Sequence, residues 1–230
     1  MTNVQMVRAV PTDQDATTVK RLRVGVGVVG LALPIVLPVG NSIISAHLGL
    51  LDSLSGSYYT HMRNVFVGGL CAIGVILLCY RHNRREDLWS SVAGFFAVVV
   101  AMCPMEPPAS VVAVASTTQK VLGGVHTFSA ALVFTALAVF CLRLFRDPAE
   151  PDGPLRQRVY LVCGVVILAC IVGIIVTGLV HFAGAGGVTP VFAGESVAVF
   201  AFGAAWFVKS DAIADLARAA GSEAVATAWR

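Results

Sequence analysis

The chain has 230 residues, of which 57% are hydrophobic and only 13% are charged, and its mean hydropathy is +0.82. Soluble domains carry roughly 25% charged residues, so this composition excludes an ordinary water-soluble domain and predicts lipid as the main solvent. The formal net charge is +3. Because the basic residues stand in short segments beside apolar runs, with no aromatic-studded basic stripe, we exclude nucleic acid as a partner.

A polar N-terminal tail, residues 1–21, precedes the first two apolar segments, at residues 22–44 and 61–80. A bilayer core takes about 20 apolar residues as helix. In lipid, only a helix satisfies all the backbone groups of a single segment internally. We therefore predict a transmembrane helix at each segment. Pro34 and Pro38 lie in the first one, and we expect them to kink it toward its C-terminal end.

Within the first span, Gly25, Gly27 and Gly30 match the GxGxxG pattern of dinucleotide-binding loops. That pattern requires a preceding strand, whereas basic residues and a predicted membrane helix surround it in this chain. We interpret the glycines as small residues that allow close helix packing.

The remaining apolar segments cover residues 88–103, 121–142, 159–180 and 191–208, and a C-terminal tail, residues 209–230, follows. The third is short because prolines stop it after Cys103. The predicted fold class is all-α. Residues 22–208 form one domain of a polytopic membrane protein, a bundle of six transmembrane helices.

Basic residues alternate between the segments that join these spans. Fourteen of the sixteen Lys and Arg residues lie in the two tails, at the start of the first span or in the second and fourth loops, and only Arg63 and Lys120 fall elsewhere. Positive charge in short loops marks the cytoplasmic side. The sequence thus predicts a multi-pass protein of the cell (plasma) membrane with both termini in the cytoplasm, an N-in/C-in topology.

Polar side chains gather near the outer ends of the predicted spans: Tyr59, Arg63, Asn64, His126 and Glu195. His126 lies about 8 Å and Glu195 about 6 Å inside its span, at 1.5 Å per residue. Ionisable groups at such depths usually face the bundle interior, a partner or a cavity. We predict that Arg63 pairs with Glu195, with His126 as the titratable third member.

A buried polar network that only fixes helix register is an open alternative for these residues. We also weighed a metal, because His61, His126 and His181 all lie toward the outer side. A zinc enzyme needs three ligands, but the chain has no HxxxH or HExxH spacing, so we predict no metal site. A haem held between His126 and His181 is a further alternative, because histidine ligates haem iron in many proteins. The sequence does not identify a cofactor.

Three short motifs resemble a group of uncharacterised bacterial six-helix membrane proteins: SGSYYTHMRNVFVG at residues 55–68, Val125-His126, and Gly194-Glu195 with FGAAW at residues 202–206. More distantly, the layout resembles the Frag1/DRAM/Sfk1 family, which is associated with membrane-lipid handling. By position, the resemblance implicates Arg63, Asn64, His126 and Glu195. Asn64 stands where an acidic residue is expected, which argues against a general base there.

The leading prediction is an outer-leaflet pocket that binds a lipid headgroup or a small anion. Arg63 would hold the anionic group, Tyr59 and Asn64 would hydrogen-bond it, and His126 with Glu195 would orient it or move a proton. One alternative is a membrane enzyme acting on lipid, with His126 as general base and Glu195 orienting it. The others are a small transporter and a structural or assembly subunit. The expected partners are membrane lipid and either a second copy of the chain or another membrane protein.

Overall fold

The computed structural model describes residues 13–45, 51–148, 152–182, 184–185 and 187–229. It is 78% helical and the described residues form no strand, so the all-α prediction is confirmed. The long helices are α1 Asp13–Ser45, α2 Arg63–Cys79, α3 Arg84–Met102, α4 Thr117–Val139, α5 Pro154–Leu179 and α6 Pro190–Lys209. Short elements are the 3-10 turn η1 Ser55–Tyr59, the π-helical turn η2 Phe140–Leu144 after α4, and the C-terminal helices α7 Ala212–Ala219 and α8 Glu223–Ala228.

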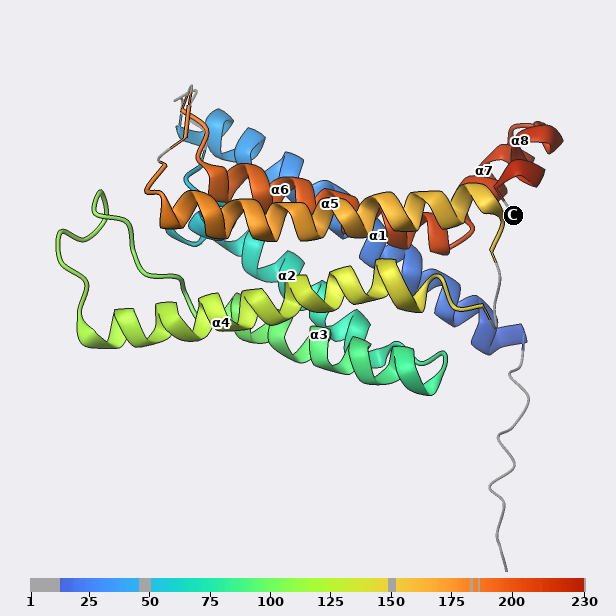
Figure 1. The fold of residues 1–230 in the computed structure, drawn as a ribbon, viewed down its shortest axis with the longest axis horizontal. Coiled ribbons are helices and arrows are strands. Elements are labelled where there is room, and N and C mark those ends of the chain that lie inside the picture. Colours follow the sequence, from blue (N-terminus) through green and yellow to red (C-terminus); the bar gives the residue numbers. More distant parts are fainter. Residues whose placement is uncertain (1–12, 46–50, 149–151, 183, 186, 230) are drawn as a thin grey trace, which may run out of the picture.

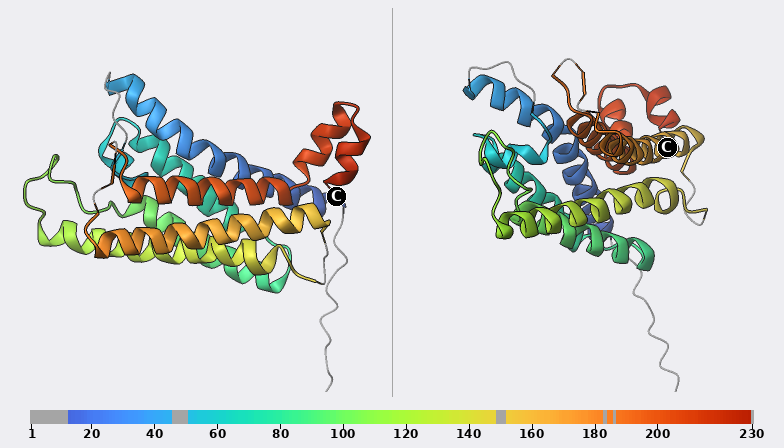
Figure 2. Two further views of the ribbon diagram at one scale, coloured as in Figure 1. Left: turned by 45° about the horizontal axis from the view of Figure 1, so that its top comes forward. Right: turned by 60° about the vertical axis from the view of Figure 1, so that its left-hand side comes forward.

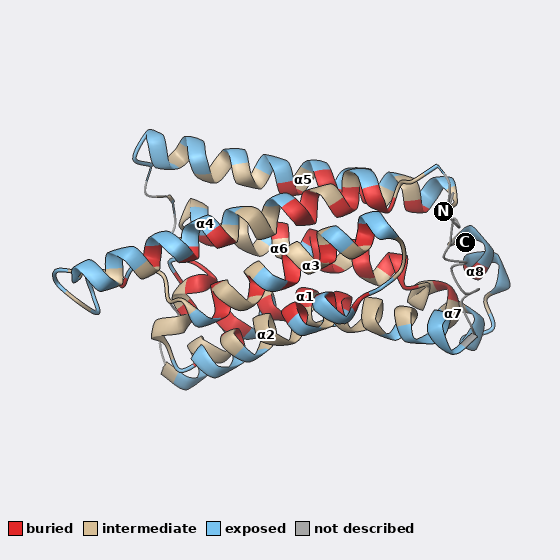
Figure 3. Ribbon diagram, turned by 90° about the horizontal axis from the view of Figure 1, so that it is seen from below, coloured by how far each residue is buried: buried red, intermediate tan, exposed pale blue. Residues whose placement is uncertain are grey.

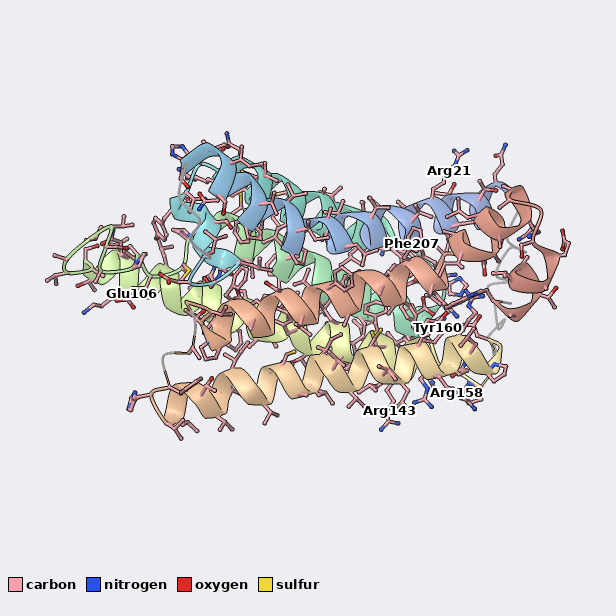
Figure 4. All side chains as sticks on the ribbon, turned by 90° about the horizontal axis from the view of Figure 1, so that it is seen from above. Arg21, Glu106, Arg143, Arg158, Tyr160 and Phe207 are labelled. Atoms are coloured by element: carbon pink, nitrogen blue, oxygen red, sulfur yellow. The ribbon has the colours of Figure 1, made fainter. Side chains whose placement is uncertain are left out.

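The six long helices form an elongated bundle with two distinct ends (Figure 1). At one end lie the first turns of α1, α3 and α5 and the last turn of α6, followed by α7 and α8 (Figure 2). We call it the basic end, because the side chains of Arg21 and Arg158 lie toward it, whereas Glu106 lies at the opposite end (Figure 4). We call that opposite end the loop end, because the segments 51–62 and 103–116 and the described residues 180–182, 184–185 and 187–189 lie there.

Four helices are long and apolar enough to cross a membrane: α1, α4 with η2, α5 and α6. The outward faces of the bundle remain apolar, and α5 leaves Val172, Val176 and Leu179 exposed (Figure 3). Exposed apolar area on this scale is unfavourable in water, whereas it is the normal surface of a helix in lipid. The chain is therefore a membrane protein.

Glycines allow α1 and α6 to pack backbone against backbone. A Cβ atom on Gly203 would lie 2.6 Å from the backbone nitrogen of Leu31, and one on Gly30 would lie 3.0 Å from Cα of Gly203. A Cβ on Gly27 would lie 2.8 Å from the backbone nitrogen of Phe207. The helix-packing interpretation of Gly27 and Gly30 is thus confirmed.

The basic end is closed by buried ion pairs that hold the helix termini together. Arg23 of α1 donates to the Tyr80 hydroxyl at 2.7 Å, which donates to Glu86 of α3. Glu86 is 1% exposed, and it lies 3.8 Å from Arg23. A buried carboxylate of this kind needs a paired cation, so this network joins α1 and α3 through the end of α2.

A second network joins the start of α5 to the end of α6. Arg156 is 4% exposed and contacts Asp211 at 2.6 Å and Asp152 at 3.1 Å. Its other terminal nitrogen donates to the carbonyl of Val208 at 2.6 Å. Lys209 completes the network through Asp152 at 2.8 Å. Val208 and Lys209 follow Trp206 in α6, and the Trp206 indole packs against four aromatic rings: Tyr80, Phe140, Phe145 and Phe202.

Candidate functional site

Glu195 connects α6 to the loop that precedes α2. The side chain of Thr189 caps α6 by accepting from the Phe192 amide at 3.0 Å, which fixes where the helix begins. Less than two turns further on, one Glu195 oxygen, Oε2, accepts from the amides of Leu54 at 2.8 Å and Ser55 at 3.3 Å. The other, Oε1, accepts from the Ser55 hydroxyl at 3.3 Å. The carboxylate therefore holds the turn at the start of η1 against α6.

His126 connects α4 to the segment that follows α3. The ring is 4% exposed, and its Nδ1 lies 2.7 Å from the carbonyl oxygen of Cys103. Because a carbonyl only accepts, Nδ1 bears the proton and Nε2 of the neutral ring keeps its lone pair. One turn earlier, Gly123 lets Glu106 approach, since a Cβ there would lie 2.7 Å from the Glu106 amide nitrogen.

Both side chains line a lateral cleft between α4, α5 and α6 at the loop end, with a volume of about 360 Å³. In Figures 1 and 3, α4 and α5 lie apart at this end. The polar part of the cleft is formed by His126, Thr127 and Glu195 with two serines of the loop, and the apolar part by isoleucines of α5 with Phe134. The cleft thus combines a group of polar side chains with an apolar wall that α5 and Phe134 form.

An apolar cavity of about 70 Å³ inside the bundle adjoins the cleft. The two spaces share the lining residues Ser55, Ala130, Phe134 and Glu195. Apart from Ser55 and Glu195, the cavity lining is apolar and comes from α1, α2, α3, α4 and α6 as well as Leu54. Glu195 therefore lines both the cleft and the internal apolar cavity.

Arg63 does not reach this cleft. Its guanidinium lies over the Tyr58 ring, 4.2 Å from the centroid, and donates to the Tyr58 hydroxyl at 2.6 Å. With Asn64 it lines a separate open groove between α2 and the end of α3. Arg63 and Glu195 have different partners, so the predicted ion pair between them is wrong.

Tyr59 occupies a third position, also outside the cleft. Its hydroxyl donates to the carbonyl of Met105 at 2.6 Å, and its ring lines a hollow with Asp52 and Thr60. Burial and the neighbouring Tyr58 raise the pKa of the Tyr59 hydroxyl, while Arg63 acts in the opposite direction. The hydroxyl therefore stays protonated and joins the two loops as a donor. Of the five predicted site residues, His126 and Glu195 line this cleft together, whereas Arg63 and Asn64 share the separate groove beside α2.

The described polar groups that line the cleft include hydrogen-bond acceptors but no cationic side chain. Its described lining residues include one carboxylate, one imidazole and three hydroxyls, but neither Lys nor Arg. Within the described part of the chain, no three His, Cys, Asp or Glu side chains lie close enough to hold a metal ion. The arrangement suits a ligand group that donates hydrogen bonds or bears positive charge.

The sequence did not indicate the Leu54 and Ser55 amides as partners of Glu195, nor the buried networks at the basic end. A backbone donor has no residue-type signature, because every residue except proline has one. The positive charge of Arg23, Arg156 and Lys209 is evident in the sequence, but it predicts only the orientation of the chain in the membrane. It does not predict that these side chains are largely removed from solvent.

The fold and the cleft define a helical membrane protein. The lining of the cleft, at the loop end of the bundle, combines polar side chains with an apolar wall. Comparison with family models, with curated proteins and with solved structures finds no match to this chain. The resemblance to the Frag1/DRAM/Sfk1 family therefore stays a prediction.

Proposed function

We propose that the chain is an integral protein of the cell membrane with six transmembrane helices and both termini in the cytoplasm. α2 and α3 lie between the same two ends as the four longer helices (Figure 1). α2 has 17 residues, about 25 Å at 1.5 Å per residue, close to the roughly 30 Å of a bilayer core. The charged residues of α3 lie in its first turn, at the basic end. Basic residues at that end support its cytoplasmic location.

A reporter of membrane sidedness tests this orientation. Fused after Gly153, at the start of α5, it should report the cytoplasm, and fused after Gly187, before α6, it should report the outside. Enzymatic reporters active on only one side of the membrane make the measurement. Signals from the same side for both fusions would contradict six spans with both termini inside.

We further propose that the lateral cleft binds a membrane lipid or a lipid-like amphiphile, which enters between α4 and α5. The observation that supports this is the lining of the cleft, in which His126 and Glu195 stand beside an apolar wall of α5 isoleucines. A lipid has the same division, with a polar head and an apolar chain. Under the proposed topology the cleft opens in the outer leaflet. A small anion would find no cation among the described residues of the cleft, so a lipid is the better ligand.

Two adjacent residues of α5 provide a matched test. Ile175 lines the cleft and is 56% exposed, whereas Val176 is 49% exposed and lies outside the cleft lining. We expect Ile175→Trp to fill the cleft and weaken lipid binding about tenfold in Kd, a change of about 1.4 kcal/mol, and so to lower lipid occupancy. Val176→Trp should leave occupancy unchanged. Native mass spectrometry of gently purified protein measures it, and equal occupancy in both variants would count against the cleft.

A lipid-modifying enzyme is the second candidate. It is favoured by the hydrogen bond from Nδ1 of His126 to Cys103, which leaves Nε2 as the basic nitrogen that a general base requires. Glu195 lines the same cleft and would orient substrate. Turnover of a lipid that is lost in His126→Ala, with lipid still bound, would favour the enzyme. A bare cleft in wild-type protein would instead favour a purely structural network.

A further inference from the structure

The acceptor capacity of Glu195 is not fully used by its own chain. From the described residues, Oε2 accepts two backbone hydrogen bonds, and Oε1 accepts one, from the Ser55 hydroxyl at 3.3 Å. An ionised carboxylate offers about four acceptor positions. At least one position on Oε1 is therefore available, and Glu195 lines the cleft in which a ligand would lie.

No described cation of the chain neutralises this carboxylate. Arg63 is engaged with Tyr58 and lines a different groove. Lys120 lies in the first turn of α4, exposed, and is absent from the cleft lining. A carboxylate beside apolar side chains is costly unless a counter-charge and hydrogen bonds compensate it. The loop supplies three hydrogen bonds to the Glu195 carboxylate, but no described cation supplies the counter-charge.

His126 adds a second acceptor to the same cleft. Its ring lies within hydrogen-bonding reach of the backbone of Cys103 and Val100. With the proton on Nδ1, the neutral ring has its one acceptor at Nε2. Together with Glu195 it favours a ligand head with several N–H donors over one that only accepts. A phosphate or carboxylate head would bring a second negative charge beside Glu195, which low dielectric makes strongly unfavourable.

The apolar wall determines the rest of the ligand. Ile171, Ile174 and Ile175 of α5 face Phe134 of α4 across the cleft, and Phe134 also lines the internal cavity. An alkyl chain can lie along this wall while its head reaches Glu195, and each buried methylene contributes about 0.8 kcal/mol of transfer free energy before other costs are counted.

We infer that the ligand of the lateral cleft is an amphiphile with a primary ammonium head, whose N–H groups donate to Glu195 and His126. This inference rests on the proposed lipid-binding function and specifies the class of head group. An ammonium group has three donors and one positive charge, which matches the two acceptors and the one unmatched negative charge of the cleft.

Four probes of equal chain length test the head group on the full chain in detergent: dodecylamine, dodecanol, dodecanoic acid and dodecyltrimethylammonium. We expect native mass spectrometry to show dodecylamine bound at least about tenfold more tightly than dodecanol, the increment of one well-placed charge pair. The trimethylammonium probe, which has the charge but no N–H donor, should bind more weakly than the amine, and the acid most weakly. Glu195→Gln keeps an acceptor for the loop amides but removes the charge, so it should abolish the preference for the amine over the alcohol.

Glu106→Gln is the matched control, because Glu106 is an exposed carboxylate at the same end and lies outside the cleft lining. It should leave the amine preference intact. Equal binding of amine and alcohol to wild-type protein, or tighter binding of the acid, would overturn the inference while leaving lipid binding standing. Failure of all four probes to bind would overturn the lipid-binding proposal itself.

Discussion

Gly203→Ala should destabilise the bundle by about 3 kcal/mol, the upper part of the range for overpacking. A Cβ at this position would meet the backbone nitrogen of Leu31 at 2.6 Å and the backbone carbon of Gly30 at 2.7 Å. Side chains can change rotamer to relieve such a contact, but backbone atoms can move only with their helix. The methyl group therefore forces α1 and α6 apart along their length and loosens the surrounding packing.

Gly173→Ala is the control, because a Cβ at Gly173 would meet nothing within 4 Å. Both glycines lie inside helices that are long and apolar enough to cross a membrane, and alanine is the better helix former in each. Unfolding in mixed micelles, followed by circular dichroism, measures the difference. We expect Gly173→Ala to be at least as stable as wild type, and equal stability of the two variants would show that the α1–α6 contact is adaptable.

The helices could be predicted from the sequence because hydropathy is a local property. Each predicted segment contains one of the six long helices or most of it, and α1 continues through Pro34 and Pro38 to Ser45. Burial could be predicted for His126 because a polar group inside an apolar segment is stable only when it faces other protein groups. The depth of a residue along a helix follows from counting at 1.5 Å per residue.

The partners of Arg63 and Glu195 could not be predicted, because the depth of a residue along its helix does not determine the direction in which its side chain points around the helix. In lipid the outward faces are as apolar as the interior, so the sequence gives little periodic signal for which side of a helix faces inward. The sequence places both Arg63 and Glu195 near the outer ends of their spans, but Arg63, at the first residue of α2, contacts Tyr58. Glu195 binds loop amides instead, and their position depends on how residues 51–62 fold back over the helix ends.

The rule that positive charge marks the cytoplasmic side treats buried and exposed arginines at the basic end alike. Arg156 and Arg158 both count as positive charges that mark the cytoplasmic side. In the structure, Arg156 is buried among Asp152, Asp211 and the Val208 carbonyl, whereas Arg158 is exposed. The charge rule describes how a chain inserts, and packing is decided afterwards by helix rotation, so a count of charges could not separate the two arginines.

Arg156→Ala should lower the stability of the folded bundle by about 3 kcal/mol, since breaking a buried pair leaves its partners uncompensated. The substitution removes the cation 2.6 Å from Asp211 and the donor to the Val208 carbonyl, at the point where α5 meets the end of α6. Arg158→Ala removes the same charge from the same segment, and as an exposed change it should cost within about 0.5 kcal/mol.

Because the two variants lose equal positive charge, they weaken the insertion signal equally, and any difference in stability belongs to the buried network. Unfolding in mixed micelles measures the difference, and the sidedness reporter after Gly187 confirms that both variants insert as wild type does. Arg156→Lys should fall between them, because lysine keeps the charge but loses the fork that contacts Asp211 and Val208 with separate nitrogens. If Arg156→Ala and Arg158→Ala were equally stable, the ion pairs at the basic end would contribute no net stability, and orientation would be the only role of its positive charge.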